Sequence, residues 1–166
     1  LRWCTLRRLS FFGSARRLVG AVLGQAPLWA LEHIADVGLG ALVELLERLP
    51  MKHLKTVRWG FNGLGVNDDA GTRVADIAPD DVWERFVRAA PPSLESFEFF
   101  GHEPLPRRLF QVPHLKRVSA GSINVGGTPD LRAWLSVLLE TGFAGHVSVA
   151  CWLFTLDWSP DKSVRL

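Results

Sequence analysis

The chain has 166 residues, of which 48% are hydrophobic and 22% are charged, and its formal net charge is +2. This length and composition are those of one globular domain and exclude a disordered chain. The charge is too small to favour nucleic acid or an anionic membrane by itself, and we do not expect nucleic acid as a partner. The apolar stretch from Leu18 to Leu31 is interrupted by Gln25 and Pro27, so we expect no membrane span.

The cysteines bear on the cellular compartment. Cys4 and Cys151 lie near opposite ends of the chain and lack metal-ligand spacing, so they predict neither a zinc site nor a disulfide framework. We expect no other metal site and no cofactor. This usage favours a reducing, cytoplasmic location. The chain begins at Leu1 without a Met, which is consistent with a processed product or a fragment of a longer protein.

Helical and strand-like segments alternate along the chain. Apolar residues that recur every three or four positions predict helices, and short apolar segments that follow a turn or a proline predict strands. In chain order these are a strand from Leu6, a helix over 18–23, a doubtful strand near Leu31, a helix over 39–49, a strand from Leu54, a polar insertion over 65–79, a helix from Asp80 to the prolines at 91–92, strands from Leu94 and Leu115, a helix over 129–140 and a strand near Val147. For the helix over 129–140, Thr128 is the predicted N-cap and Gly142 the stop signal. The alternation predicts parallel strands joined by helices, either in a doubly wound sheet or in a curved solenoid of repeats.

One phrase recurs and favours the solenoid. His53-Leu54-Lys55-Thr56-Val57 and His114-Leu115-Lys116-Arg117-Val118 are near copies, and each closely follows a proline. Three of the four intervals between the first leucines of the strand-like segments lie within the roughly 20–29 residues of a leucine-rich unit.

These units resemble the leucine-rich repeat family, whose pattern is Leu-x-x-Leu-x-Leu-x-x-Asn-x-Leu. All five positions are matched by Leu54, Val57, Trp59, Asn62 and Leu64. The match is partial in the units that begin at Leu6, Leu94 and Leu115. In the unit at Leu31, Asp36 occupies a position where the pattern has an apolar residue. The resemblance implies an α/β leucine-rich-repeat-like solenoid over residues 1–152, with about five or six parallel strands on a concave face and helices on the convex face. We expect residues 153–166 to form a cap or tail.

In such a repeat, alternate strand residues point into the core and outward onto the concave face. Guanidinium, carboxylate and aromatic groups that anchor protein interfaces recur at the outward positions. We therefore expect a non-catalytic domain that binds a protein partner through these residues: Arg8, Phe12, Arg58, Glu98, Phe100 and Arg117.

Catalytic constellations are scarce. The five histidines fall in separate units, so none has an evident catalytic partner, and we do not expect an enzyme. Two alternatives stay open. One is an α/β enzyme with a site at the carboxyl ends of its strands, near Asn62, His102 and Asn124. The other is a purely structural segment of a longer repeat protein, which would expose apolar surface at its ends.

Overall fold

The structure is a computed structural model of the whole chain. It describes residues 6–10, 30–59, 79–100, 105–121, 130–150, 155–159, 161 and 164–165, without the side chains of Phe100, Val164 and Arg165. The predicted helix over 18–23 and positions 65–78 of the predicted insertion lie outside these residues.

The centre of the fold is one sheet whose eight strands follow one another in chain order. The first six are parallel, whereas the last two pair antiparallel. The strands are β1 (Arg8–Ser10), β2 (His33–Ala35), β3 (Thr56–Trp59), β4 (Ser96–Phe100), β5 (Arg117–Gly121), β6 (His146–Ala150), β7 (Thr155–Trp158) and β8 (Val164–Arg165). The expected α/β class with a mostly parallel sheet is confirmed, and the described sheet lacks the reversal of strand order that a doubly wound fold would show.

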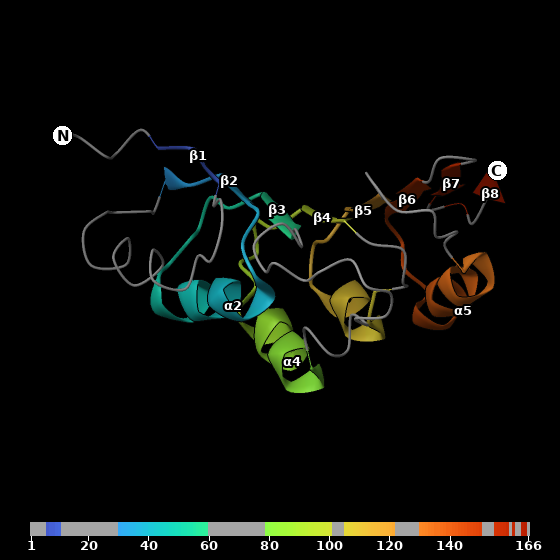
Figure 1. Cartoon of the computed structure of the whole chain (residues 1–166), viewed down its shortest axis with the longest axis horizontal. Helices are drawn as coiled ribbons and strands as arrows, with labels where there is room; N and C mark the ends of the chain where they lie inside the picture. The colour runs from blue at the N-terminus through green and yellow to red at the C-terminus, as the bar shows by residue number, and fades with distance from the viewer. Residues whose placement is uncertain are drawn as a thin grey trace, which may run out of the picture.

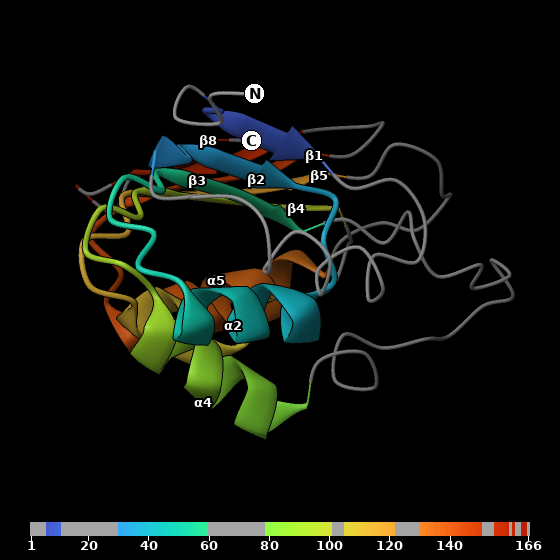
Figure 2. The same ribbon diagram turned by 90° about the vertical axis from the view of Figure 1, so that its left-hand side faces the viewer.

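Helices cover one side of this sheet. The described part of the chain contains α2 (Leu39–Arg48), α4 (Asp80–Ala89) and α5 (Leu131–Thr141), together with the 3-10 helix η3 (Arg107–Gln111). Figure 2 shows the sheet as an upper layer and the helices as a lower layer. In Figure 1 the strands follow a shallow arc whose hollow side faces away from the helices.

Three units enter their strands through equivalent hydrogen bonds. The N–H groups of Leu54, Leu94 and Leu115 each donate to the carbonyl three residues earlier, at 3.2, 3.0 and 3.3 Å. The two residues after each of these leucines donate together to one carbonyl of the preceding unit, which belongs to Glu32, Lys55 and Glu95 respectively. The backbone therefore repeats its hydrogen bonding from unit to unit, although the turns differ in conformation, since His114 is left-handed with φ 67° and His53 is not.

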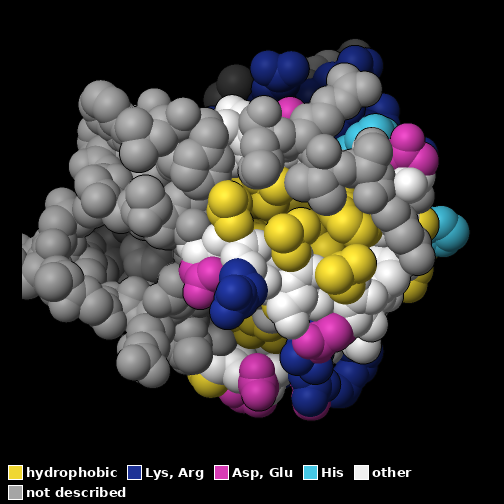
Figure 3. Space-filling view, turned by 90° about the vertical axis from the view of Figure 1, so that its right-hand side faces the viewer, with side chains coloured by type: hydrophobic (Ala, Val, Ile, Leu, Met, Phe, Trp, Pro, Cys, Tyr) yellow, Lys and Arg dark blue, Asp and Glu magenta, His cyan; other side chains and the backbone are white. Residues whose placement is uncertain are grey.

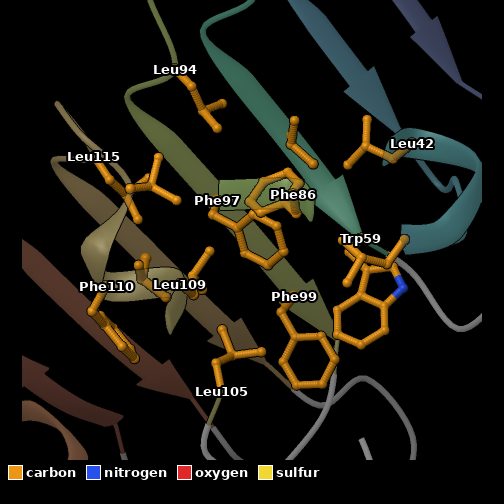
Figure 4. Close-up of a cluster of buried hydrophobic side chains, with 14 of the residues drawn as sticks. Leu42, Trp59, Phe86, Leu94, Phe97, Phe99, Leu105, Leu109, Phe110 and Leu115 are labelled. Carbon is orange, nitrogen blue, oxygen red and sulfur yellow. The ribbon is translucent and has the colours of Figure 1, made fainter. Parts of the chain in front are cut away.

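The core lies between the sheet and the helices, as the alternation of apolar residues predicted. Trp59 of β3 stacks on Phe99 of β4 with ring centroids 4.9 Å apart, and its ring meets the edge of Trp83 from α4 at 5.4 Å. All three side chains are at most 2% exposed. Figure 4 shows the inward side chains of successive strands packed into one continuous cluster with those of α2, α4 and η3. Within the described residues every tryptophan is buried, so these side chains are part of the core.

The doubtful strand near Leu31 is present as β2, and both Leu31 and Ile34 are fully buried. Asp36 adopts a left-handed conformation with φ 59°, which turns its side chain out of the apolar pattern and lets Val37 enter the core one position late. The last helix begins at Leu131, and its N-cap is Asp130, whose carboxylate accepts from the N–H of Ala133 at 3.0 Å, so the expected cap at Thr128 is wrong.

Candidate functional site

Two rows of polar side chains cross the hollow side of the sheet. Strand pairing aligns the first row as Arg8, His33, Thr56, Ser96, Arg117 and His146. It aligns the second as Ser10, Ala35, Arg58, Glu98, Ser119, Ser148 and Asp157. Every residue of these rows except Ala35 is at least partly exposed. We call the two rows together the hollow face.

Four of the predicted partner-binding residues lie on this face. Arg8 and Arg117 belong to the first row, and Arg58 and Glu98 are direct neighbours in the second. Phe12 lies outside the described residues. The backbone of Phe100 ends β4, but its side chain is not among those described.

Asp36 organises the β1 to β3 end of the hollow face. One of its carboxylate oxygens accepts hydrogen bonds from Ser10 Oγ at 2.7 Å and from Arg58 Nη2 at 2.8 Å. The side chain of Asp36 is only 9% exposed, whereas that of Arg58 is 33% exposed. A charged pair in such a partly buried place is screened less than a surface pair, so Asp36 fixes the direction of the Arg58 guanidinium.

Sequence reasoning treated Asp36 as a defect in the repeat and so missed this role. The residue type could have indicated a turn at this position, because Asp tolerates the left-handed conformation better than most residues. The side chain that broke the apolar pattern is the one that orients the predicted binding arginine.

His33 lies beside this group in the first row. Burial lowers the pKa of His33 from its ordinary value of 6.5, because desolvation disfavours the charged ring. The nearby carboxylate of Glu98 opposes this change, and the guanidinium of Arg58 adds to it. The lowered pKa favours the neutral ring of His33 on the hollow face.

A pocket of about 560 Å³ occupies the other end of the hollow face, over β5, β6 and β7. Its charged and polar lining residues are Arg117, His146, Ser148, Asp157, Ser159 and Asp161. This volume is in the range of small-ligand and side-chain pockets. Of these residues only Arg117 was predicted as a binding residue. His146 and Ser148 lie on β6 beside Arg117 and Ser119 of β5, but the outward side chains of that strand were not predicted. Asp157, Ser159 and Asp161 were missed because they come near only when β7 turns back antiparallel along β6.

The lysines of the repeated phrase have a structural role at the edge of the sheet. Lys55 Nζ lies 3.5 Å from a carboxylate oxygen of Glu32, and Lys116 Nζ lies 2.7 Å from one of Glu95. The hydrogen bond from Lys116 lowers the pKa of Glu95. With Arg7, which pairs with Glu32 at 3.6 Å, these side chains form a row of alternating charge one residue before the strands. In both copies of the phrase the lysine therefore pairs with a glutamate of the unit before it.

Two absences within the described residues bear on other classes of site. No group of three or more His, Cys, Asp and Glu side chains there is placed to hold a metal ion. No helix in the same part of the chain is long and apolar enough to cross a membrane. Asn62, His102 and Asn124, which the enzyme alternative required, all lie outside the described residues.

Comparison with known proteins adds no relative: no family model, curated protein or solved structure matches the chain.

Proposed function

We propose that the chain is a leucine-rich-repeat-like interaction domain, a curved solenoid of stacked units that binds a protein partner through the hollow face. The solenoid rests on three observations: the sequential strand order, the equivalent hydrogen bonds in the turns before β3, β4 and β5, and the repeated hydrogen bonds between units. Stacked units of this kind bury a continuous core and leave the curved strand surface free for recognition.

The observation that carries the binding role is the difference between the two sides of the sheet. The described helices cover one side, whereas the other presents a nearly unbroken polar surface across seven strands. Arginine is enriched among the residues that contribute most to binding at protein interfaces. A side chain that is already oriented before binding also loses less entropy when the complex forms. Arg58 is such a side chain, because Asp36 holds it in place.

The pocket supplies an anchor point on this surface. A partner side chain that enters it would meet Arg117 from β5 on one side and Asp157 from β7 on the other. Such a dipolar pocket favours a partner segment that carries both an acidic and a basic residue.

Charge reversal on the two sides of the sheet tests the proposal. The immobilised chain is used to capture proteins from a cell extract, and each captured protein is then purified and titrated by calorimetry. Arg117→Glu should weaken the titrated complex at least about tenfold, because juxtaposed like charges cost several kcal/mol at an interface. Arg88→Glu is the matched control, since Arg88 is an exposed arginine of α4 on the helical side.

Arg58→Glu is a second variant, to be compared only after circular dichroism shows that it folds, because it places a carboxylate beside Asp36. Equal affinity of the wild type and Arg117→Glu, or an equal loss in Arg88→Glu, would contradict binding through the hollow face.

A further inference from the structure

Four polar side chains of the pocket over β5, β6 and β7 are unpaired. Among the residues that the structure describes, Arg117, His146, Ser148 and Asp157 form no side-chain hydrogen bond or ion pair. The charged side chains one position before the strands, by contrast, pair with one another. Figure 3 views the molecule from the end where β7 and β8 lie and shows basic, acidic and histidine side chains near its upper edge, on the hollow side of the sheet. The hydrogen-bonding groups of this pocket are therefore available to a ligand.

The two unpaired charges stand at opposite corners of the pocket. Arg117 pairs in register with His146, and Ser148 of the same strand pairs with Asp157. Arg117 and Asp157 are thus two strands and two residues apart, which places their Cα atoms about 12 Å from each other. The imidazole of His146 and the hydroxyl of Ser148 lie on the strand between them. A group that binds carboxylates and a group that binds cations therefore line one space.

We propose that this pocket binds the C-terminal residue of the partner and that this residue is a lysine. The proposal rests on the proposed function for the source of the ligand, because the hollow face is taken to bind a protein. Arg117 would bind the terminal carboxylate, and Asp157 would bind the side-chain ammonium. In an extended lysine six bonds separate these two groups, a distance of about 7 Å. One residue therefore carries both complementary charges at a separation that suits the two strands.

The other polar residues of the lining favour a chain end that carries lysine. A chain end enters with its last peptide unit, whose N–H and C=O need partners, and His146 and Ser148 can donate and accept hydrogen bonds. The pocket volume of about 560 Å³ is in the range that holds a whole small ligand. Asp161, which accepts from Ser159, lines the pocket together with Asp157. These acceptors suit an ammonium, which donates three hydrogen bonds from one point.

Small probes test the pocket without any partner. Nα-acetyl-lysine imitates a C-terminal lysine, because its α-nitrogen is an amide and its carboxylate is free. Calorimetric titration of the whole chain should show binding in the millimolar range, and the NMR signals of the His146 ring should shift, since that ring lines the pocket. Nα-acetyl-lysine amide lacks the carboxylate, and the Nα,Nε-diacetyl form lacks the ammonium. Each should bind at least about tenfold more weakly, because each loses one charge-assisted contact.

Charge-neutral variants test which residue binds which group. Arg117→Gln and Asp157→Asn should each weaken binding of Nα-acetyl-lysine at least about tenfold. Arg117→Gln should also bind the amide as well as the free acid, and Asp157→Asn should no longer distinguish the ammonium from its acetylated form. Both residues are exposed, so the variants should keep their fold, which circular dichroism checks. Arg8→Gln, at the other end of the first row, and Glu44→Gln on α2 are the matched controls and should bind as the wild type does.

The partner itself tests the source of the ligand. A carboxypeptidase that removes only basic C-terminal residues should weaken the captured partner at least about tenfold in the same titration. Unchanged affinity after this treatment, or a captured partner without a C-terminal lysine, would overturn the assignment to a chain end.

The probes give their own contrary results. No binding of Nα-acetyl-lysine, equal affinity for its amide, tighter binding of Nα-acetyl-arginine, or unchanged discrimination in Arg117→Gln and Asp157→Asn would each overturn the proposal. None of these outcomes touches capture of a partner by the hollow face, which the Arg58→Glu variant reports at the opposite end of the sheet. The proposal and the proposed function can therefore fail separately.

Discussion

Replacement of Trp59 by alanine tests the alternation of buried and exposed residues along the strands. The Trp59 side chain is 1% exposed and contacts Phe99 of the next strand and Trp83 of α4, with ring centroids 4.9 and 5.4 Å away. Removal of a large buried aromatic side chain costs about 3–5 kcal/mol, and the cost is highest where the surroundings cannot collapse into the space. Two rigid rings line this space, so we expect a loss of at least about 3 kcal/mol.

Urea denaturation followed by fluorescence and circular dichroism measures this loss. The urea concentration at the unfolding midpoint should fall, while the slope of the unfolding free energy against urea concentration should stay unchanged. Ser119→Ala, on the outward row of β5, is the control and should change the free energy of unfolding by less than about 0.5 kcal/mol. If Trp59→Ala does not fold, Trp59→Leu should still cost about 1–3 kcal/mol, as volume is lost without polar burial. A loss below about 1 kcal/mol for Trp59→Ala would refute the strand register.

Three further predictions concern individual charges. The pKa of Glu95 lies below its ordinary value of 4.5 because Lys116 donates a hydrogen bond to its carboxylate. The pairing therefore stabilises the fold above pH 4.5, and this stabilisation is lost as the pH falls through the lowered pKa. Lys116→Met should raise the Glu95 pKa, which a carboxyl NMR titration measures. Asp36→Ala should be less stable than Asp36→Gly by about 1 kcal/mol in urea denaturation, because both lose the same hydrogen bonds but only glycine adopts the left-handed conformation without cost. The NMR titration midpoint of His33 should lie below 6.5 and fall further in Glu98→Gln, since the Glu98 carboxylate favours the charged ring; a rise would contradict the arrangement of the hollow face.

Local patterns in the sequence predicted the strands and helices where side-chain periodicity dominates. Leu54 and Leu115 predicted strand entries because each is an apolar residue at the end of a segment that closely follows the start of a proline-marked break, and both are buried in the core. The alternation of Val57 and Trp59 with polar residues predicted the buried and outward sets of β3. These patterns succeed because they depend on neighbours within one element.

The features of the fold and of the site that were not predicted depend on contacts between residues that are distant in the sequence. Asp36 broke the pattern, and only its left-handed backbone and its pairing with Arg58 explain why the strand still forms. The pocket could not be predicted because Asp157 meets His146 and Arg117 only through the antiparallel return of β7. Neither the pairing direction of a terminal strand nor the neighbours it gains can be inferred from short-range periodicity.

Histidine footprinting of a captured complex tests the central claim most directly, because the chain contains its own control. His33 and His146 lie on the hollow face, whereas His53 and His114 lie in the exposed turns before β3 and β5. Carbethoxylation, followed by mass spectrometry, reports the solvent access of each ring with and without the partner. Binding through the hollow face predicts that His146 and His33 become protected while His53 and His114 react as before. Protection of His53 and His114 with unchanged His146 would contradict the account.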